Sequence, residues 1–234
     1  MKSGENDVLF HVEHLKEIAS WLNQGLADFG LNIDERLRED LSRYFALLLD
    51  KNKSFNLISS KMALKDMVAV HLLDSLAALK WPGWSQAGQA LDIGSGAGLP
   101  AIPLSLTNPN WNFTLAESTG KKASFLKEVQ VKLNLKNVTI ANEYLIPGLT
   151  KSERRFDLIT ARAVSELKKL ISVAGPRLKL GGIFLAYKGP RGQEEITNAQ
   201  TVLKQGKLRL IEQIDLTLPL VEAERHLYFF QKNE

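Results

Sequence analysis

The stretch from residue 91 to residue 100, LDIGSGAGLP, combines one acid with three closely spaced glycines. An apolar segment leads through Asp92 into Gly94, Gly96 and Gly98. Glycine has no Cβ and adopts positive φ without strain, so such a turn lets a bound molecule approach the backbone closely. The glycines would offer backbone N–H groups, and Asp92 would attract a positively charged group on the ligand. The pattern predicts a loop that binds a nucleotide-like cofactor.

The spacing of the glycines separates two kinds of cofactor. The dinucleotide fingerprint G-x-G-x-x-G would place its third glycine at position 99, which is Leu99. Here the third glycine comes one residue earlier, which disfavours a nicotinamide cofactor. The pattern D-x-G-x-G-x-G resembles motif I of the S-adenosylmethionine (SAM) methyltransferases. Leu99 would then pack against SAM or against the sheet, and a purely structural turn is the alternative reading of the whole stretch.

A second acid, Glu117, ends the apolar segment 112–116 and lies 23 residues beyond Gly94. A carboxylate at this place can accept hydrogen bonds from both hydroxyls of a ribose. The alternative is a favourable charge beside the N-terminus of a helix expected over 121–133. Because a glycine-rich loop precedes it, we favour the ribose role, which NAD enzymes share.

The net charge of +4 is unevenly distributed. Residues 1–50 carry five Lys or Arg against ten Asp or Glu, so the remainder carries +9. Seven basic residues face one acid over 161–191, and five lysines face one acid over 119–136. A single lysine is usually a solvated surface charge, but two such segments favour a polyanionic partner.

Basic residues near the ends of strand candidates are expected to contact this partner. Arg162 follows the segment 156–161, and its planar guanidinium suits a bidentate phosphate contact or stacking on a base. The alternative is an ion pair with Glu166, one helical turn later. The expected nucleic-acid contacts are Lys121, Lys122, Arg162, Lys188, Arg191 and Arg225.

The elements before about residue 80 have a helical pattern. Apolar residues recur at spacings of three and four over 37–49, and Asn32 followed by Glu35 predicts a capping-box start. A second helix is expected over about 63–80. His71 and Asp74 would share one face of it and order a contact between parts of the chain.

From about residue 88 onward the spacing of apolar residues changes from that of helices to that of strands. Strand candidates lie at 89–93, 111–116, 137–142, 156–161, 183–188, 208–214 and 225–231. Helical patterns separate most of the early ones, which is typical of βαβ units around a parallel sheet. The last two are divided only by a short turn with Pro219, so they are expected to pair as an antiparallel hairpin at one end of the sheet.

Several classes of function are disfavoured by composition. The chain has no cysteine, which excludes disulfides, thiolate metal sites and cysteine nucleophiles. Its four histidines lack ligand spacing, so no metal is expected. No apolar run approaches the roughly eighteen residues of a membrane helix, and the N-terminus lacks the order of a secretory signal. We expect a monomer in the cytoplasm.

The fourth strand candidate narrows the reaction. It continues FDLITARA over 156–163 and lacks the [DN]-P-P-[YF] motif with which aminomethyltransferases hold an exocyclic amine. The absence of cysteine excludes cysteine-dependent methylation at pyrimidine C5. The remaining chemistry includes attack by an atom that is already nucleophilic, such as guanine N7. The enzyme then has only to align N7 with the methyl group, so we predict no general base, with Arg162 as the best candidate for positioning the base.

The chain resembles the bacterial 16S rRNA (guanine-N7) methyltransferase family, also called glucose-inhibited division protein B. The matching blocks span about 52–231 in the family's order: Asn56-Leu57, HLLDSL at 71–76, DIGSGAGLPAIPLS at 92–105, GKKASFL at 120–126, ARAVSEL at 161–167, AYKG at 186–189 and ERHLYFF at 224–230. The resemblance implies the class I SAM-dependent methyltransferase fold, a Rossmann-like seven-stranded mixed sheet with the last strand antiparallel. It implies a helical N-terminal cap over 1–84 and a SAM-binding domain over 85–234.

In that family the SAM contacts would map to Gly94, Leu99, Arg162 and the backbone near Tyr144 and Leu145. Leu145 stands where the family often has an acid near the adenine. The implied substrate is a guanine in the 530 loop of 16S rRNA, as free RNA or within the 30S subunit. The alternatives are a SAM-dependent methyltransferase for another RNA, a small molecule or a protein, an NAD-dependent enzyme, and a non-catalytic RNA-binding module.

Overall fold

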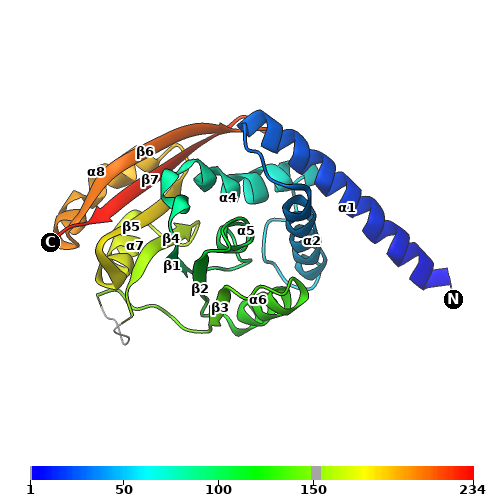
Figure 1. The fold of residues 1–234 in the computed structure, drawn as a ribbon, viewed down its shortest axis with the longest axis horizontal. Helices are drawn as coiled ribbons and strands as arrows, with labels where there is room; N and C mark the ends of the chain where they lie inside the picture. Colours follow the sequence, from blue (N-terminus) through cyan, green and yellow to red (C-terminus); the bar gives the residue numbers. More distant parts are fainter. Residues whose placement is uncertain (1, 149–153) are drawn as a thin grey trace.

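The structure, a computed structural model, describes residues 2–148 and 154–234. Within these residues seven strands form one mixed sheet, in the order β3-β2-β1-β4-β5-β7-β6 (Figure 1). The strands are β1 (Gly88–Ile93), β2 (Trp111–Ala116), β3 (Val138–Ala141), β4 (Phe156–Arg162), β5 (Leu178–Lys188), β6 (Leu208–Leu218) and β7 (Ala223–Lys232). Strands β1 to β5 pair in parallel, and β7 runs antiparallel between β5 and β6. The predicted mixed sheet with its antiparallel final hairpin is confirmed.

Helices cover both faces of this sheet. They are α1 (Lys2–Phe29), α2 (Glu35–Asn52), α3 (Leu64–Met67), α4 (Asp74–Leu76), α5 (Ala101–Thr107), α6 (Gly120–Lys132), α7 (Leu167–Ala174) and α8 (Gly192–Gln205). Figure 1 shows α1 running away from the sheet, with the N-terminus at its far end. None of the helices in the described ranges combines the length and apolarity needed to cross a membrane.

The helix predicted over about 63–80 forms, but its winding changes along its length. It begins as α3, widens into the π-helical stretch Val68–Leu73, returns to α-helix in α4, and tightens into a 3₁₀ turn over Ala77–Lys80. We refer to 64–80 as the bridging helix. Short π stretches inside helices are often found at functional sites. Here the widened stretch contains His71 and is followed directly by Asp74.

The start of α2 differs from the prediction. Asn32 is not the capping residue, because the helix begins at Glu35 and the N-cap is Asp34. The Asp34 Oδ1 accepts a hydrogen bond of 2.8 Å from the N–H of Leu37. A capping side chain has to directly precede the first helical residue to reach the N–H groups of the first turn, which Asn32 does not.

Two clusters of buried side chains lie on the two faces of the sheet. Alternate residues of β5 belong to different clusters, with Leu185 and Tyr187 on one face and Phe184 and Ala186 on the other. This is the alternation of a strand buried on both sides. The first face is covered by the N-terminal helices, the bridging helix, α5 and α6, and the second by α7 and α8.

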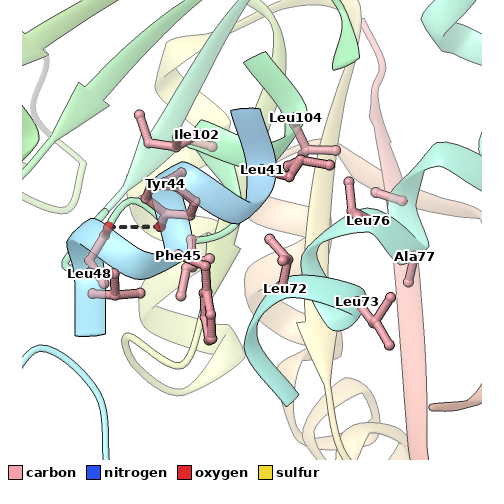
Figure 2. Close-up of a cluster of buried hydrophobic side chains, with 14 of the residues drawn as sticks. Leu41, Tyr44, Phe45, Leu48, Leu72, Leu73, Leu76, Ala77, Ile102 and Leu104 are labelled. Carbon is pink, nitrogen blue, oxygen red and sulfur yellow. Dashed lines mark hydrogen bonds between the residues drawn. The ribbon is translucent and has the colours of Figure 1, made fainter. Parts of the chain in front are cut away.

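The first cluster fixes the N-terminal helices to the sheet. Figure 2 shows Tyr44 and Phe45 of α2 packed near Leu72 of the bridging helix and Ile102 of α5. Full burial of a leucine or phenylalanine side chain contributes roughly 1.5–3 kcal/mol. The Tyr44 hydroxyl also donates a hydrogen bond of 2.9 Å to the carbonyl of Ala97, inside the glycine-rich loop. The N-terminal helices therefore contact the loop as well as the core.

Candidate active site

An open pocket of about 1010 Å³ lies at the carboxyl ends of the central strands. Gly94 follows β1, Glu117 follows β2, Arg162 ends β4 and Lys188 ends β5, and all four residues line the pocket. Ligands of open α/β sheets bind at this edge, where the strand order reverses beside β1. The volume is at the upper end of the range for pockets that enclose small ligands, ~300–1,000 Å³.

The glycine-rich loop has the backbone conformation that its composition predicts. Gly94, Gly96 and Gly98 have φ values of +65°, +56° and +95°. A Cβ on Gly98 would lie 2.6 Å from Cγ1 of Ile102, whereas a Cβ on Gly96 would meet nothing closer than 3.8 Å. Gly94 and Gly96 line the pocket. Gly98 instead allows close packing of the loop on α5.

Glu117 holds this loop and also faces the pocket. Its Oε2 accepts a hydrogen bond of 2.8 Å from the N–H of Gly96, and its Oε1 accepts one of 2.7 Å from the N–H of Thr119. Each carboxylate oxygen has a second lone pair. The carboxylate can therefore keep both backbone bonds and still accept hydrogen bonds from two ligand hydroxyls.

Asp92 lies beneath the loop and does not line the pocket. It is buried, and its Oδ1 accepts a hydrogen bond of 2.6 Å from the Thr160 hydroxyl of β4. Among the described residues nothing hydrogen-bonds its Oδ2. Burial raises the pKa of Asp92 to about 6, against the opposing hydrogen bond from Thr160. The side chain thus links β1 to β4 beneath the glycine-rich loop.

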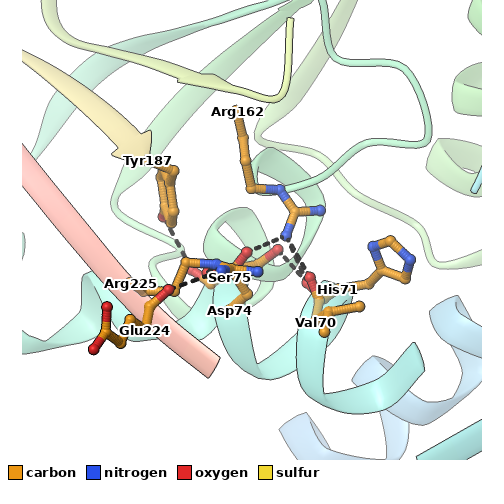
Figure 3. Close-up of polar contacts among 8 residues, drawn as sticks. All are labelled: Val70, His71, Asp74, Ser75, Arg162, Tyr187, Glu224 and Arg225. Atoms are coloured by element: carbon orange, nitrogen blue, oxygen red, sulfur yellow. Dashed lines mark hydrogen bonds and ion pairs between the residues drawn. The ribbon is translucent and has the colours of Figure 1, made fainter. Parts of the chain in front are cut away.

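The opposite wall is built around a buried carboxylate, Asp74 (Figure 3). Arg162 Nη1 lies 2.9 Å from Asp74 Oδ2 and also donates to the carbonyls of Val70 and His71. Arg225 Nε lies 3.2 Å from Asp74 Oδ1. Side-chain exposure is 5% for Asp74, 11% for Arg162 and 21% for Arg225, so the three charges are largely desolvated together.

This arrangement corrects the alternative expected for Arg162. Its ion-pair partner is Asp74 of the bridging helix and not Glu166. Glu166 is exposed, at the N-cap of α7, and the chain between the two residues turns at Ala163, which has a φ of +55°. The expected pair required residues 162 and 166 to lie one turn apart on the same helix, and the turn at Ala163 prevents this. Asp74 does order a contact between parts of the chain, as expected.

His71 lies on the same wall of the pocket and is uncharged at neutral pH. Burial, together with the charges of Arg162 and Arg225, lowers the pKa of His71 to about 4. Within the described ranges no group hydrogen-bonds its buried Nε2. A neutral imidazole beside two guanidinium groups avoids a third positive charge in a desolvated place.

The remaining predicted residues divide into two groups. Those that line the pocket are Leu99, Lys122, Lys188, Arg191 and Arg225. Those outside its lining are Asp92, Gly98, Lys121, Tyr144 and Leu145. Tyr144 is 73% exposed, and Leu145 packs against the cluster of α7 and α8. Lys188 is turned inward, with its Nζ 2.7 Å from Glu195 Oε2 and its side chain 9% exposed.

Several lining residues were not predicted as site residues, although Leu57 and Val164 lie in blocks that match the family. Leu57 and Ile58 line the pocket in a connection fixed by Asn52, whose Oδ1 accepts from both of their N–H groups at 2.7 and 3.0 Å. Val164 and Glu195 also line it. Their positions depend on contacts between distant segments. No cluster of three or more potential metal ligands occurs in the part of the chain that the structure describes.

Comparisons with known proteins identify a family for this chain. The family model described as rRNA small subunit methyltransferase G (GidB) matches residues 37–227. The Ribosomal RNA small subunit methyltransferase G of Aromatoleum aromaticum is 38% identical over 219 residues, 92% of this chain and 99% of that protein. The protein of the same name from Chromobacterium violaceum is 36% identical over 206 residues, 88% of this chain and 94% of that protein.

Solved structures are similar in fold at low sequence identity. A SAM dependent methyltransferase from Aquifex aeolicus superposes with a TM-score of 0.55 at 16% identity, over 71% of this chain and 93% of that one. The N-methyltransferase NodS from Bradyrhizobium japonicum has a TM-score of 0.52 at 15% identity, over 68% of this chain and 94% of that one. These likenesses agree with the predicted class I methyltransferase architecture.

Proposed function

The chain belongs to the GidB family, described as rRNA small subunit methyltransferase G, and we propose that it transfers a methyl group from SAM to N7 of a guanine in the 530 loop of 16S rRNA. The observation that carries the proposal is one pocket with two kinds of wall. A glycine-rich loop with Glu117 forms one wall, and the cluster of Asp74, Arg162 and Arg225 forms the other.

The first wall fits SAM. Gly94 and Gly96 leave open backbone at the end of β1, and Glu117 presents a carboxylate suited to the two ribose hydroxyls. Leu99 supplies an apolar contact beside them. When bound, SAM supplies a methyl group on a positively charged sulfur, which a nucleophile can attack. The N–H groups of the loop and the Glu117 carboxylate would hold it without rearranging the sheet.

The second wall suits a base. The bonds from Arg162 within the described residues all use Nη1, so its other donors remain for a ligand. A guanidinium donates well to guanine O6. Guanine N7 has a free lone pair, so no side chain has to remove a proton from it. Arg162, locked by Asp74, would orient the base, and its rigidity is the catalytic contribution.

The pocket rim supports a nucleic-acid substrate. Lys122 of α6, Arg191 before α8 and Arg225 of β7 line the pocket, so their charges would meet phosphates around the entering base. We propose that residues 1–84 act as the helical cap of this site, because Leu57, Ile58 and His71 supply part of its lining. We propose 16S rRNA, as free RNA or within the 30S subunit, as the substrate, and cytoplasmic action as a monomer.

Transfer of labelled methyl from SAM tests the proposal. The acceptors are naked 16S rRNA and 30S subunits from cells that lack the modification, and the labelled base and atom are mapped afterwards. Label at N7 of a guanine in the 530 loop is the expected result. Label in protein or on an exocyclic amine overturns the chemistry, and SAM affinity that survives in a folded Gly96→Arg variant overturns the assigned cofactor wall.

A further inference from the structure

The segment between β4 and α7, residues 163–166, lines the pocket beside the glycine-rich loop. Val164 lies directly on the glycine-rich loop, since a Cβ added to Gly94 would be 2.8 Å from its Cγ1. Val164 is also 42% exposed and lines the pocket. We call residues 163–166 the partition loop. Its position decides how much room a ligand has above Gly94.

The partition loop is not held by its own backbone conformation. Ala163 has a φ of +55°, in a region that residues with a Cβ seldom adopt. Such a conformation persists only where surrounding contacts enforce it. The first end is fixed by Arg162 through its ion pair with Asp74. The other end needs a separate anchor.

That anchor is the ion pair of Lys188 and Glu195. Lys188 Nζ lies 2.7 Å from Glu195 Oε2 and 3.3 Å from the carbonyl oxygen of Ser165. The same Glu195 oxygen accepts a hydrogen bond of 2.9 Å from the N–H of Leu167, the first residue of α7. Lys188 therefore holds Ser165, and Glu195 holds Leu167, on the two sides of Glu166.

The burial of Lys188 indicates that its ammonium group is held by contacts inside the protein. Its side chain is 9% exposed, and a charge taken out of water is costly unless it is paired. Burial acts to raise the pKa of Glu195, but the bonds from Lys188 and Leu167 outweigh it and leave that pKa below its ordinary value. Glu195 is therefore ionised at neutral pH and complements the lysine. Lys188 thus uses two of its three N–H donors inside the protein, on Glu195 and Ser165.

We propose that Lys188 and Glu195 are positioning residues for the methyl transfer: together they set the partition loop against Gly94 so that Val164 closes the cofactor side of the pocket. This inference rests on the proposed function. The two side chains act through the loop and touch neither reacting atom. It is an alternative to the prediction that Lys188 contacts RNA, and the salt dependence below decides between the two.

Three variants test the pair, namely Lys188→Met, Glu195→Gln and Lys188→Arg. We expect the first two each to lower kcat by about tenfold or more, because small misplacements in a preorganised site are costly. They should also weaken binding of S-adenosylhomocysteine, measured by calorimetry. The double variant should be little worse than either single one, since both remove the same interaction. Lys188→Arg should recover most of the lost activity.

The salt dependence of rRNA binding separates positioning from a phosphate contact. A lost phosphate contact lowers the slope of log K against log salt by about 1. We expect no change of slope in Lys188→Met and a decrease in Arg191→Gln. The proposal is overturned if Lys188→Met lowers this slope but leaves kcat and S-adenosylhomocysteine affinity unchanged, and if Glu195→Gln changes none of the three quantities.

Lys179→Met is the matched control. It makes the same substitution at the other end of β5, where Lys179 pairs with Asp157 at 2.8 Å and is 46% exposed. It should leave every readout unchanged.

Hydrogen exchange of the Leu167 amide reports on the partition loop itself. The exchange should be faster in Lys188→Met and in Glu195→Gln than in the parent protein. If exchange and S-adenosylhomocysteine affinity are both unchanged in the two variants, the proposal is overturned, whatever their activity. If the parent protein fails to methylate rRNA, the proposed function fails, and these two measurements still decide the role of the Lys188–Glu195 pair.

Discussion

Arg162 Nη1 lies 2.9 Å from Asp74 Oδ2, and this ion pair joins the end of β4 to the bridging helix across 88 residues of sequence. Arg225 of β7 uses the second oxygen of the same carboxylate. One buried acid thus links three elements at the pocket, and its removal would leave two cations without their partner.

Asp74→Ala should therefore lower both stability and activity. Removing one partner of a buried ion pair costs about 3–5 kcal/mol, because the remaining charge is left desolvated. Urea unfolding measures the free energy of unfolding. Asp215→Ala is the comparison, since Asp215 is 61% exposed and pairs with His226 at 2.6 Å. A loss in Asp74→Ala no larger than that in Asp215→Ala would contradict a structural role for the cluster.

Two glycines of the loop should respond differently to alanine. Gly98→Ala places a Cβ 2.6 Å from Ile102 at a φ of +95°, so we expect a loss of stability of about 1–3 kcal/mol. Gly96→Ala is strained by a φ of +56°, but its Cβ meets nothing closer than 3.8 Å, so stability should change less while SAM affinity falls. Thermal unfolding and calorimetry with SAM separate the two effects. Equal destabilisation by both would contradict the assignment of Gly96 to the ligand side.

Glu117→Gln should weaken SAM binding by about tenfold, because a hydrogen bond to a charged acceptor contributes about 1.5–3 kcal/mol. The amide also cannot accept with both of its ends, so the bond from Gly96 or from Thr119 is lost. Calorimetry with SAM measures the affinity. Glu39→Gln, at an exposed position of α2 outside the pocket lining, is the control and should bind normally.

Acid should destabilise the protein through His71. Its pKa falls from 6.5 to about 4 on folding, so between these values the unfolded chain binds the extra proton. The stabilising contribution is complete above pH 6.5 and is lost as the pH falls to about 4, at about 1.4 kcal/mol per pH unit.

Asp92 acts in the opposite direction over an overlapping window. Its pKa rises from 3.8 to about 6, so between these values the folded state binds the extra proton, and stability falls as the pH rises. The two slopes partly cancel in the parent protein. Unfolding at a series of pH values should show a steeper acid loss in Asp92→Asn and a smaller or inverted one in His71→Gln. Parallel profiles in all three proteins would contradict both assignments.

The sequence predicted the elements well where the pattern is local. The strand expected over 111–116 is Trp111–Ala116, and the three glycines have the positive φ that their spacing suggests. Local patterns suffice there because alternation and turn chemistry act over a few residues. The N-cap of α2 was misplaced by two residues, at Asn32 and not Asp34.

The polar partners were not predictable in the same way. Arg162 and Asp74 are 88 residues apart, and nothing in either segment says that strand order will bring them together. Lys188 was expected to contact nucleic acid, and nothing in its own segment predicts that Glu195 pairs with it and leaves its side chain 9% exposed. Gly189 lies on the turn after β5 and Gly192 begins α8, which is then placed against β5. Such pairings depend on topology, which composition and spacing do not contain.

The π-helical stretch Val68–Leu73 has a consequence for insertions and deletions. A π turn bonds residue i to i+5 and so holds about one residue more than an α turn. Deleting one residue there would leave an ordinary α turn, so Asp74 would keep its place opposite both arginines. Inserting one residue could not be absorbed in this way and would rotate everything after it by about 100° around the helix axis. Asp74 would then point away from both arginines although every side chain of the site was still present. This helix should therefore tolerate the loss of one residue better than the gain of one, which a substitution scan would miss and single-codon deletions and insertions would reveal.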